Sequence, residues 1–208
     1  MKGEKIVAYR SLERIGATCG MVYVALVYVG SGLGVPGSAI GTLLVLLGFL
    51  FFLVFLGSLW SAMRRAEGGD GWLSAAAFGA GLMSITIGLG SLAPLLVARY
   101  RAGGLDPQLA EAFHDIEEAS FFLAFLPLAV LLAVFAIVAI RPGGLPRWLG
   151  WVGAVLSAAF LIGGLVGSFN LASEWAQVPN LVYPIWVIAT SVVLIRRAGE
   201  PRALATEE

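Results

Sequence analysis

The feature that most constrains this chain is a series of six long apolar stretches separated by short polar or glycine- and proline-rich segments. Hydrophobic side chains make up 59% of the 208 residues, charged side chains only 12%, and the mean hydropathy is +0.91. In soluble domains about a quarter of the residues are charged. Because a helix of roughly 20 apolar residues crosses the hydrocarbon core of a bilayer, the sequence predicts an all-α, polytopic membrane protein with six transmembrane helices.

The six predicted spans belong to a single transmembrane domain, 1–208. The first span follows a basic segment, as in a signal peptide, but its twenty residues reach the roughly 30 Å needed for a retained crossing. The last span is close to the lower limit of length. The predicted spans are 15–34, 38–60, 72–97, 121–140, 148–169 and 178–195.

The distribution of positive charge predicts the orientation of the spans. If all six cross, eleven of the thirteen Lys and Arg residues fall on the side of the two termini, and only Arg99 and Arg101 fall on the other. Basic flanks resist translocation, so both termini are predicted to be cytoplasmic. The excess of Arg over Lys and the abundance of Ala and Gly favour a bacterial origin, and hence the plasma (inner) membrane.

Several classes of function are disfavoured by composition. A formal net charge of zero argues against a nucleic-acid binder, which needs a basic surface. Cys19 is the single cysteine, so an intramolecular disulfide or a thiolate metal cluster cannot form. No Asp, Glu, Lys, Arg or His lies at mid-membrane depth, whereas proton-coupled pumps and voltage sensors usually need such groups.

Small side chains in spans three and five predict close helix packing. Lipid is therefore the expected surrounding, and small-residue faces of this kind also serve contacts between copies in a homo-oligomer or with another membrane protein. Trp175 and Tyr183 are predicted to mark the outer membrane boundary. The small residues are Ala76, Ala80, Ser84 and Gly88 in span three, and Gly163, Gly164, Gly167 and Ser168 in span five.

A short acidic segment precedes span four. Asp106 followed by Pro107 is typical of a helix start, so helix four is predicted to begin outside the membrane with an amphipathic extension over 107–120. The segment holds the only histidine and five of the six carboxylates predicted to lie outside the cell. At 100° per residue, one arc of about 100° carries its polar side chains, and Leu109, Phe113 and Ile116 face the opposite side. The arc contains Glu111, His114, Asp115 and Glu118.

Carboxylates next to an imidazole suit a divalent cation, and Glu111 and His114 have the i, i+3 spacing of carboxylate-bridged metal sites in helical bundles. A dinuclear site needs a second such pair, so only a mononuclear site is expected within one chain, from Glu111, His114, Glu118 and Glu174. The simpler explanation is solvation, because acidic side chains near a helix start are favoured by its dipole. A pH-sensing role for His114 is a further alternative.

Arg99 and Arg101 lie just before the acidic helix. They are expected to pair with its carboxylates and hold the loop. Alternatively, they hold an anionic headgroup or a substrate carboxylate, which a guanidinium group matches well.

The run Leu145-Pro146-Arg147-Trp148-Leu149-Gly150, before a glycine-rich span and a last span preceded by Pro179, resembles the C-terminal part of an uncharacterised bacterial family. That family is the domain of unknown function DUF4386, and the resemblance covers about the last seventy residues. It implies six spans and assigns no activity or catalytic residues.

The sequence favours a non-catalytic role, the binding or passage of a small cation, polar metabolite or lipid headgroup at the outer face. The candidate residues are Glu111, His114, Asp115, Glu118, Arg99 and Arg101. One alternative is a membrane enzyme that uses a divalent metal held by His114 and nearby carboxylates. Another is an assembly partner for a second membrane protein.

Overall fold

The computed structural model describes residues 2–32, 38–101, 104–141, 145–171 and 174–199. In these ranges the chain forms six α-helices and one short 3₁₀ helix, with no strand. The elements are α1 (Lys2–Gly32), α2 (Ala39–Glu67), α3 (Trp72–Tyr100), α4 (Pro107–Ile140), α5 (Arg147–Phe169), η1 (Glu174–Gln177) and α6 (Val178–Gly199).

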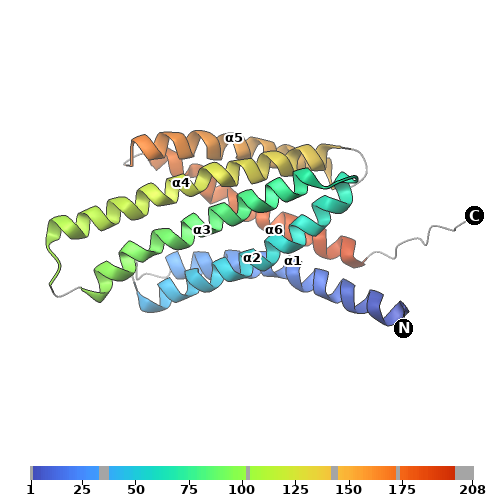
Figure 1. The fold of residues 1–208 in the computed structure, drawn as a ribbon, viewed down its shortest axis with the longest axis horizontal. Coiled ribbons are helices and arrows are strands. Elements are labelled where there is room, and N and C mark those ends of the chain that lie inside the picture. Colours follow the sequence, from blue (N-terminus) through green and yellow to red (C-terminus); the bar gives the residue numbers. More distant parts are fainter. Residues whose placement is uncertain (1, 33–37, 102–103, 142–144, 172–173, 200–208) are drawn as a thin grey trace, which may run out of the picture.

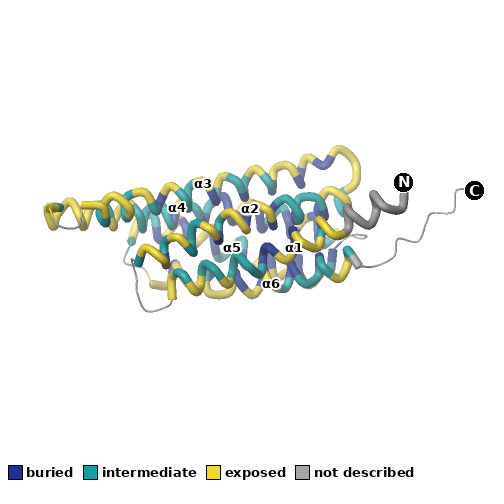
Figure 2. The backbone as a smooth tube through the Cα atoms, turned by 90° about the horizontal axis from the view of Figure 1, so that it is seen from below, coloured by how far each residue is buried: buried dark blue, intermediate teal, exposed yellow. Residues whose placement is uncertain are grey.

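The six α-helices run back and forth along one axis and form a closed bundle (Figure 1). Each helix packs against the next one in the sequence, and α6 also packs against α1. All six are long and apolar enough to cross a membrane, which confirms the predicted multi-pass helical bundle. Large apolar side chains are exposed along the outer sides of the helices, where a bilayer would cover them (Figure 2).

The start of α1 and the end of α6 lie at the same end of the bundle (Figure 1). We call this the basic end, because Arg64, Arg65, Arg141, Arg147, Arg196 and Arg197 lie near the helix ends there, and Arg14 lies in the first half of α1. The opposite end, which we call the acidic end, contains η1 and the junction between α3 and α4. The last predicted span, the shortest, is part of a 22-residue helix that reaches about 33 Å.

At the acidic end, α3 and α4 project beyond the other helices as a hairpin (Figure 1). Helix α4 has 34 residues, equivalent to about 51 Å, which is longer than the hydrocarbon core. The Asp106 side chain accepts a hydrogen bond from the Gln108 N–H at 2.8 Å, and Pro107 occupies the first helical position. The predicted extension of helix four is therefore confirmed.

Helices α4 and α5 pack through a heptad-like row on α5. Its members recur at alternating intervals of three and four residues, which is the pattern of two α-helices that coil around each other with a left-handed supercoil. The Ser157 hydroxyl donates to the Ala129 carbonyl of α4 at 2.8 Å, and a Cβ added at Gly167 would overlap the Phe122 ring of α4. The row consists of Gly150, Gly153, Ser157, Phe160, Gly164 and Gly167.

The predicted small-residue face of span three is only partly correct. Ser84 donates to the Ala124 carbonyl of α4 at 3.0 Å and Gly88 faces Phe49 of α2, but Ala76 is exposed. A spacing of four residues drifts by about 40° per step around an α-helix, so one face cannot hold the whole row.

The glycines of α5 pack inside the bundle, whereas Gly79 and Gly90 of α3 have open space around them. A homo-oligomer contact through small-residue faces stays a prediction.

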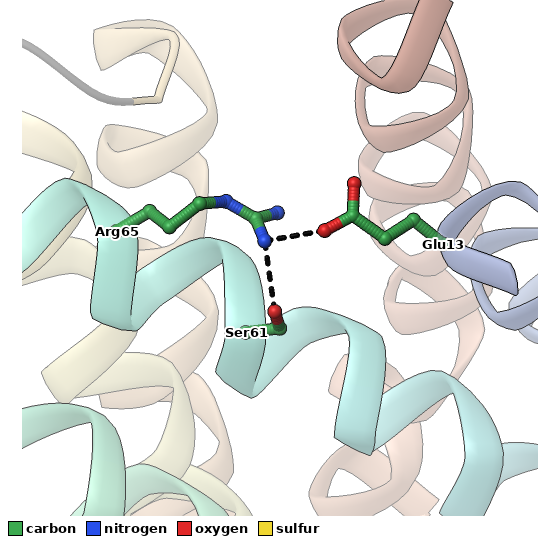
Figure 3. Close-up of polar contacts among 3 residues, drawn as sticks. All are labelled: Glu13, Ser61 and Arg65. Carbon is green, nitrogen blue, oxygen red and sulfur yellow. Dashed lines mark hydrogen bonds and ion pairs between the residues drawn. The ribbon is translucent and has the colours of Figure 1, made fainter. Parts of the chain in front are cut away.

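Two polar arrangements fix the helices at the basic end. The Glu67 carboxylate, at the end of α2, accepts hydrogen bonds from the Leu73 and Ser74 N–H groups, both at 2.9 Å, and caps α3. The Arg65 guanidinium contacts the Glu13 carboxylate of α1 and donates to the Ser61 hydroxyl at 2.8 Å (Figure 3).

The pKa of Glu67, which lies beyond the apolar part of α2, is shifted by several neighbours. Burial raises the pKa, but hydrogen bonds from the Ser74 hydroxyl and from the Ser74 and Leu73 N–H groups lower it, as does the charge of Arg141. The net effect lowers the pKa below the ordinary value. Glu67 is therefore ionised at neutral pH and satisfies N–H groups that the first turn of α3 leaves unpaired.

Candidate functional site

The predicted acidic site lies on the projecting part of α4. Glu111, His114 and Asp115 are exposed there, and Glu118 is half-buried. The opposite side of this segment is also largely uncovered, since Leu109 and Ile116 are exposed. The four polar residues share one face of a helix whose first part projects from the bundle (Figure 1).

His114 contacts a carboxylate outside the predicted set. Its Nδ1 atom lies 3.5 Å from Oε2 of Glu117, one helical turn further along α4. Burial raises the pKa of Glu117; His114 opposes this effect, and Glu118 reinforces it. The i, i+3 spacing from His114 is the signal that could have identified Glu117, which lies on the helix next to Phe113 and outside the predicted polar arc.

The predicted metal ligands do not form a cluster. Across residues 11–198, apart from the undescribed loops, no three His, Cys, Asp or Glu side chains gather closely enough to hold a metal ion. Glu174 begins η1, which packs on α5, whereas Glu111 and His114 project beyond the bundle on α4. A site that uses all of these residues would need a change in their relative positions.

Arg99 and Arg101 do not form the predicted clamp. The Arg99 guanidinium donates to the Thr42 hydroxyl of α2 at 3.3 Å, and Arg101 is exposed at the end of α3. The two ion pairs found among the described side chains are Arg65–Glu13 and His114–Glu117, and neither includes these arginines. Arg99 therefore links α3 to α2 near the acidic end.

A cavity between α1 and α6 was not predicted. Its volume is about 140 Å³, and it lies in the half of the bundle nearer the acidic end. We call it the α1–α6 groove. From Ser31 to Tyr23 it extends along eight residues of α1, a depth of about 12 Å. Its lining consists of Tyr23, Val24, Val27, Tyr28, Ser31, Asn180, Leu181, Tyr183 and Pro184.

The groove combines apolar walls with a few polar groups, and none of its lining residues is charged. At its shallow end, the Tyr28 hydroxyl donates to the Asn180 carbonyl at 2.8 Å and joins α1 to α6. At its deep end, Tyr183 is only 3% exposed, and its buried hydroxyl has no hydrogen-bond partner among the described residues. A buried polar group without a partner is costly, but essentially none of this hydroxyl oxygen is accessible, so the groove does not reach it.

The prediction that Tyr183 marks the membrane boundary is wrong. Its ring packs between Phe160, at a centroid distance of 5.5 Å and nearly perpendicular, and Trp186, at 6.0 Å and nearly parallel. Trp175, eight residues earlier in the chain, is by contrast 86% exposed. Tyrosine at the end of an apolar run is typical of an interfacial belt, and the sequence does not show that the ring turns inward.

Comparison of the chain with protein-family models, curated proteins and solved structures found no match. The resemblance of the last seventy residues to DUF4386 therefore stays a prediction. The functional argument depends on the geometry of the chain itself.

Proposed function

We propose that this protein is a non-catalytic membrane protein that binds a small molecule or lipid headgroup in the α1–α6 groove, at its outer face. The observation that supports this proposal most directly is the cavity of about 140 Å³ between α1 and α6, which has mainly apolar walls and no charged residue in its lining. The position of this cavity in the outer half of the bundle agrees with the face expected from the sequence.

The orientation in this proposal follows from charge. The basic end carries the Arg clusters, and basic flanks remain in the cytoplasm. The acidic end, with the projecting hairpin and the shallow end of the groove, would then face outward across a bacterial plasma membrane.

Among the ligand classes expected from the sequence, the groove favours an uncharged group. No lining residue supplies a charge to pair with an ion, and the walls are mainly apolar. Burying an unpaired charge in such surroundings is costly. Cation binding at the projecting acidic segment would use exposed side chains in water, where ion pairs contribute little.

Analysis of co-purified molecules tests this function. The protein is purified in mild detergent from its membrane, and bound small molecules are identified by native mass spectrometry. We expect an adduct whose occupancy falls in Leu181→Trp, which enlarges an exposed side chain of the groove lining. Val155→Trp is the matched control, because Val155 of α5 is 69% exposed and lies outside that lining. Equal adduct occupancy in both variants, or no adduct at all, would contradict the proposal.

A metal-dependent membrane enzyme is the second candidate, favoured by the contact between His114 and Glu117. Elemental analysis distinguishes it from the first. A stoichiometric transition metal that is lost in His114→Ala would favour the enzyme, and its absence in the wild-type protein would count against it.

A further inference from the structure

Helix α3 lies along one edge of the bundle, and among the described elements it contacts only α2 and α4 (Figure 2). Apart from Ala75 and Leu96, its exposed residues form a single row, at positions 72, 76, 79, 83, 86, 90, 93, 97 and 100. We call this row, from Trp72 to Tyr100, the α3 seam. Its intervals alternate between four and three residues, which is the pattern of a helix that packs lengthwise against a second helix.

The middle of the α3 seam differs from the lipid-facing sides of other helices. Between its aromatic ends it consists mainly of small residues, and a Cβ added at Gly79 or Gly90 would have nothing within 4 Å. Lipid tails do not require small side chains, whereas the close approach of a second helix does. Helices α2 and α5 expose mainly large apolar side chains, such as Leu47, Leu50 and Val54 of α2 and Val155, Leu161 and Leu165 of α5.

The α3 seam continues onto the hairpin that projects beyond the other helices (Figure 1). Near this end of α3, Val97 is 44% exposed and Tyr100 is 92% exposed. Lipid tails do not reach this part of the helix, and removing its apolar surface from water is favourable. A partner that covers the whole seam therefore has a membrane helix that continues outside the bilayer, as a second copy of this chain has.

Two copies would meet along the α3 seam in a parallel arrangement. Every copy is inserted in the same orientation, because the same basic flanks determine it. A two-fold axis along the membrane normal then places each seam residue level with its own counterpart. Gly79 and Gly90 would each face a glycine, and no seam residue is charged, so no like charges oppose each other.

The exposed area of the α3 seam is sufficient for a dimer. A buried aromatic side chain contributes about 150–250 Å², so Trp72, 69% exposed, and Tyr100, 92% exposed, together offer roughly 350 Å² per copy. Two copies offer roughly 700 Å² from these positions alone. The remaining positions, which include Met83 at 59% exposure, raise the total above the roughly 1,000 Å² expected of a specific interface.

We infer that the α3 seam is the interface of a parallel homodimer, in which a second copy of this chain packs its own α3 against it. The α1–α6 groove is on the other side of this assignment, since neither α1 nor α6 contacts α3 among the described elements. Dimer formation and binding in the groove are therefore separate properties, and each can be tested without the other.

Disulfide cross-linking in membranes tests whether a second copy occupies the seam. The full-length protein, with its native Cys19 replaced by alanine, carries either Thr86→Cys in the seam or Leu50→Cys on α2. Leu50 is 54% exposed and lies at a similar depth, because its neighbour Phe49 packs on Gly88 of α3. With copper phenanthroline as the oxidant, Thr86→Cys should give a product of twice the chain mass, and Leu50→Cys should not.

Substitution of Gly90 provides a graded test. Because a Cβ at Gly90 has open space within one copy, Gly90→Leu should fold, but its side chain would separate the two copies. Overpacking of this kind predicts dimerisation about 5- to 150-fold weaker. Gly90→Ala keeps the side chain small, as does Gly79→Ala, and should stay dimeric. Sedimentation equilibrium in density-matched micelles measures the dissociation constant, and circular dichroism verifies the helix content.

The outcomes decide the occupant of the α3 seam. Cross-linking through Thr86→Cys alone, with weaker dimerisation in Gly90→Leu but not in Gly90→Ala, supports the homodimer. A cross-linked product of another mass would assign the seam to a different membrane protein and overturn the homodimer. A monomeric wild-type protein, equal cross-linking through Leu50→Cys, or an unchanged dissociation constant in Gly90→Leu would overturn it as well.

Discussion

Substitution of Gly163 by alanine tests how α5 positions the start of α6. A Cβ at Gly163 would lie 2.6 Å from the Ala176 carbonyl oxygen of η1. Ordinary contacts between carbon and a carbonyl oxygen are about 3.3 Å or longer, so the two segments would have to separate by about 0.7 Å. Because the obstacle is backbone, no side-chain rotation can relieve it. Overpacking of this kind costs about 1–3 kcal/mol.

The same substitution also has a favourable component, since alanine is better than glycine in a helix by up to about 1 kcal/mol. Gly79→Ala is the control, because Gly79 is helical and has nothing within 4 Å of its added Cβ. The propensity gain is common to both variants, so Gly163→Ala should be less stable than Gly79→Ala by the overpacking cost of about 1–3 kcal/mol.

Reversible unfolding in mixed micelles of increasing dodecyl sulfate content, followed by circular dichroism, measures this difference. Gly163→Ala should also weaken ligand binding in the groove, because η1 leads directly into Asn180. If Gly163→Ala proves as stable as Gly79→Ala, the close approach of η1 to α5 does not control this part of the fold.

Three further substitutions test other contacts. Glu67→Gln should lower the free energy of unfolding by about 1 kcal/mol at neutral pH, because it weakens the cap of α3. Folding lowers the pKa of Glu67, so this loss should fade as the pH falls through that pKa. Thermal melts between pH 7 and pH 3 would show the change. Glu117→Gln should instead stabilise the protein at neutral pH, because the raised pKa of Glu117 means that its ionised form is unfavourable in the folded state. Thermal melts should show no such gain at a pH below the ordinary glutamate pKa. Ser157→Ala removes the hydrogen bond to the Ala129 carbonyl and should lower the free energy of unfolding in micelles by about 0.5–1 kcal/mol. An unchanged stability would mean that this bond contributes nothing.

The membrane bundle and the start of α4 could be predicted because they follow from local signals, whereas α1 begins at Lys2 and α2 ends at Glu67, beyond the predicted spans 15–34 and 38–60. Apolar runs of crossing length, basic flanks and glycine turns determine where each helix lies, and the Asp106–Pro107 pair marked the start of α4. These features depend on residues near one another in the chain. They required no knowledge of which helices meet.

The groove could not be predicted because its two walls are far apart in the sequence. Tyr28 and Asn180, which join the walls, are separated by 152 residues. Apolar residues facing a neighbouring helix, lipid or a cavity have the same hydropathy, so periodicity does not distinguish them. Tyr183 illustrates this limit, since its sequence position indicates the interface and its ring is buried.

The acidic segment illustrates a different limit. The 100° spacing of an α-helix places Glu111, His114, Asp115 and Glu118 on one arc of α4, but both sides of this segment are largely exposed. It did not show that η1 contacts α5 and α6 but not α4, so Glu174 was included in the predicted metal site. Spacing within one helix predicts which of its side chains lie close together. Whether four ligands from different segments converge depends on the tertiary structure, which that spacing does not determine.

The two walls of the groove belong to the first and last membrane helices, and this has a consequence for biogenesis. During synthesis α1 enters the bilayer long before the ribosome has released α6. Until then α1 can pack on α2, but the face that later meets α6 remains open to lipid. If the groove binds the proposed ligand, binding can therefore begin only after α6 has joined α1, and a nascent chain that stalls after α5 would be inserted but unable to bind.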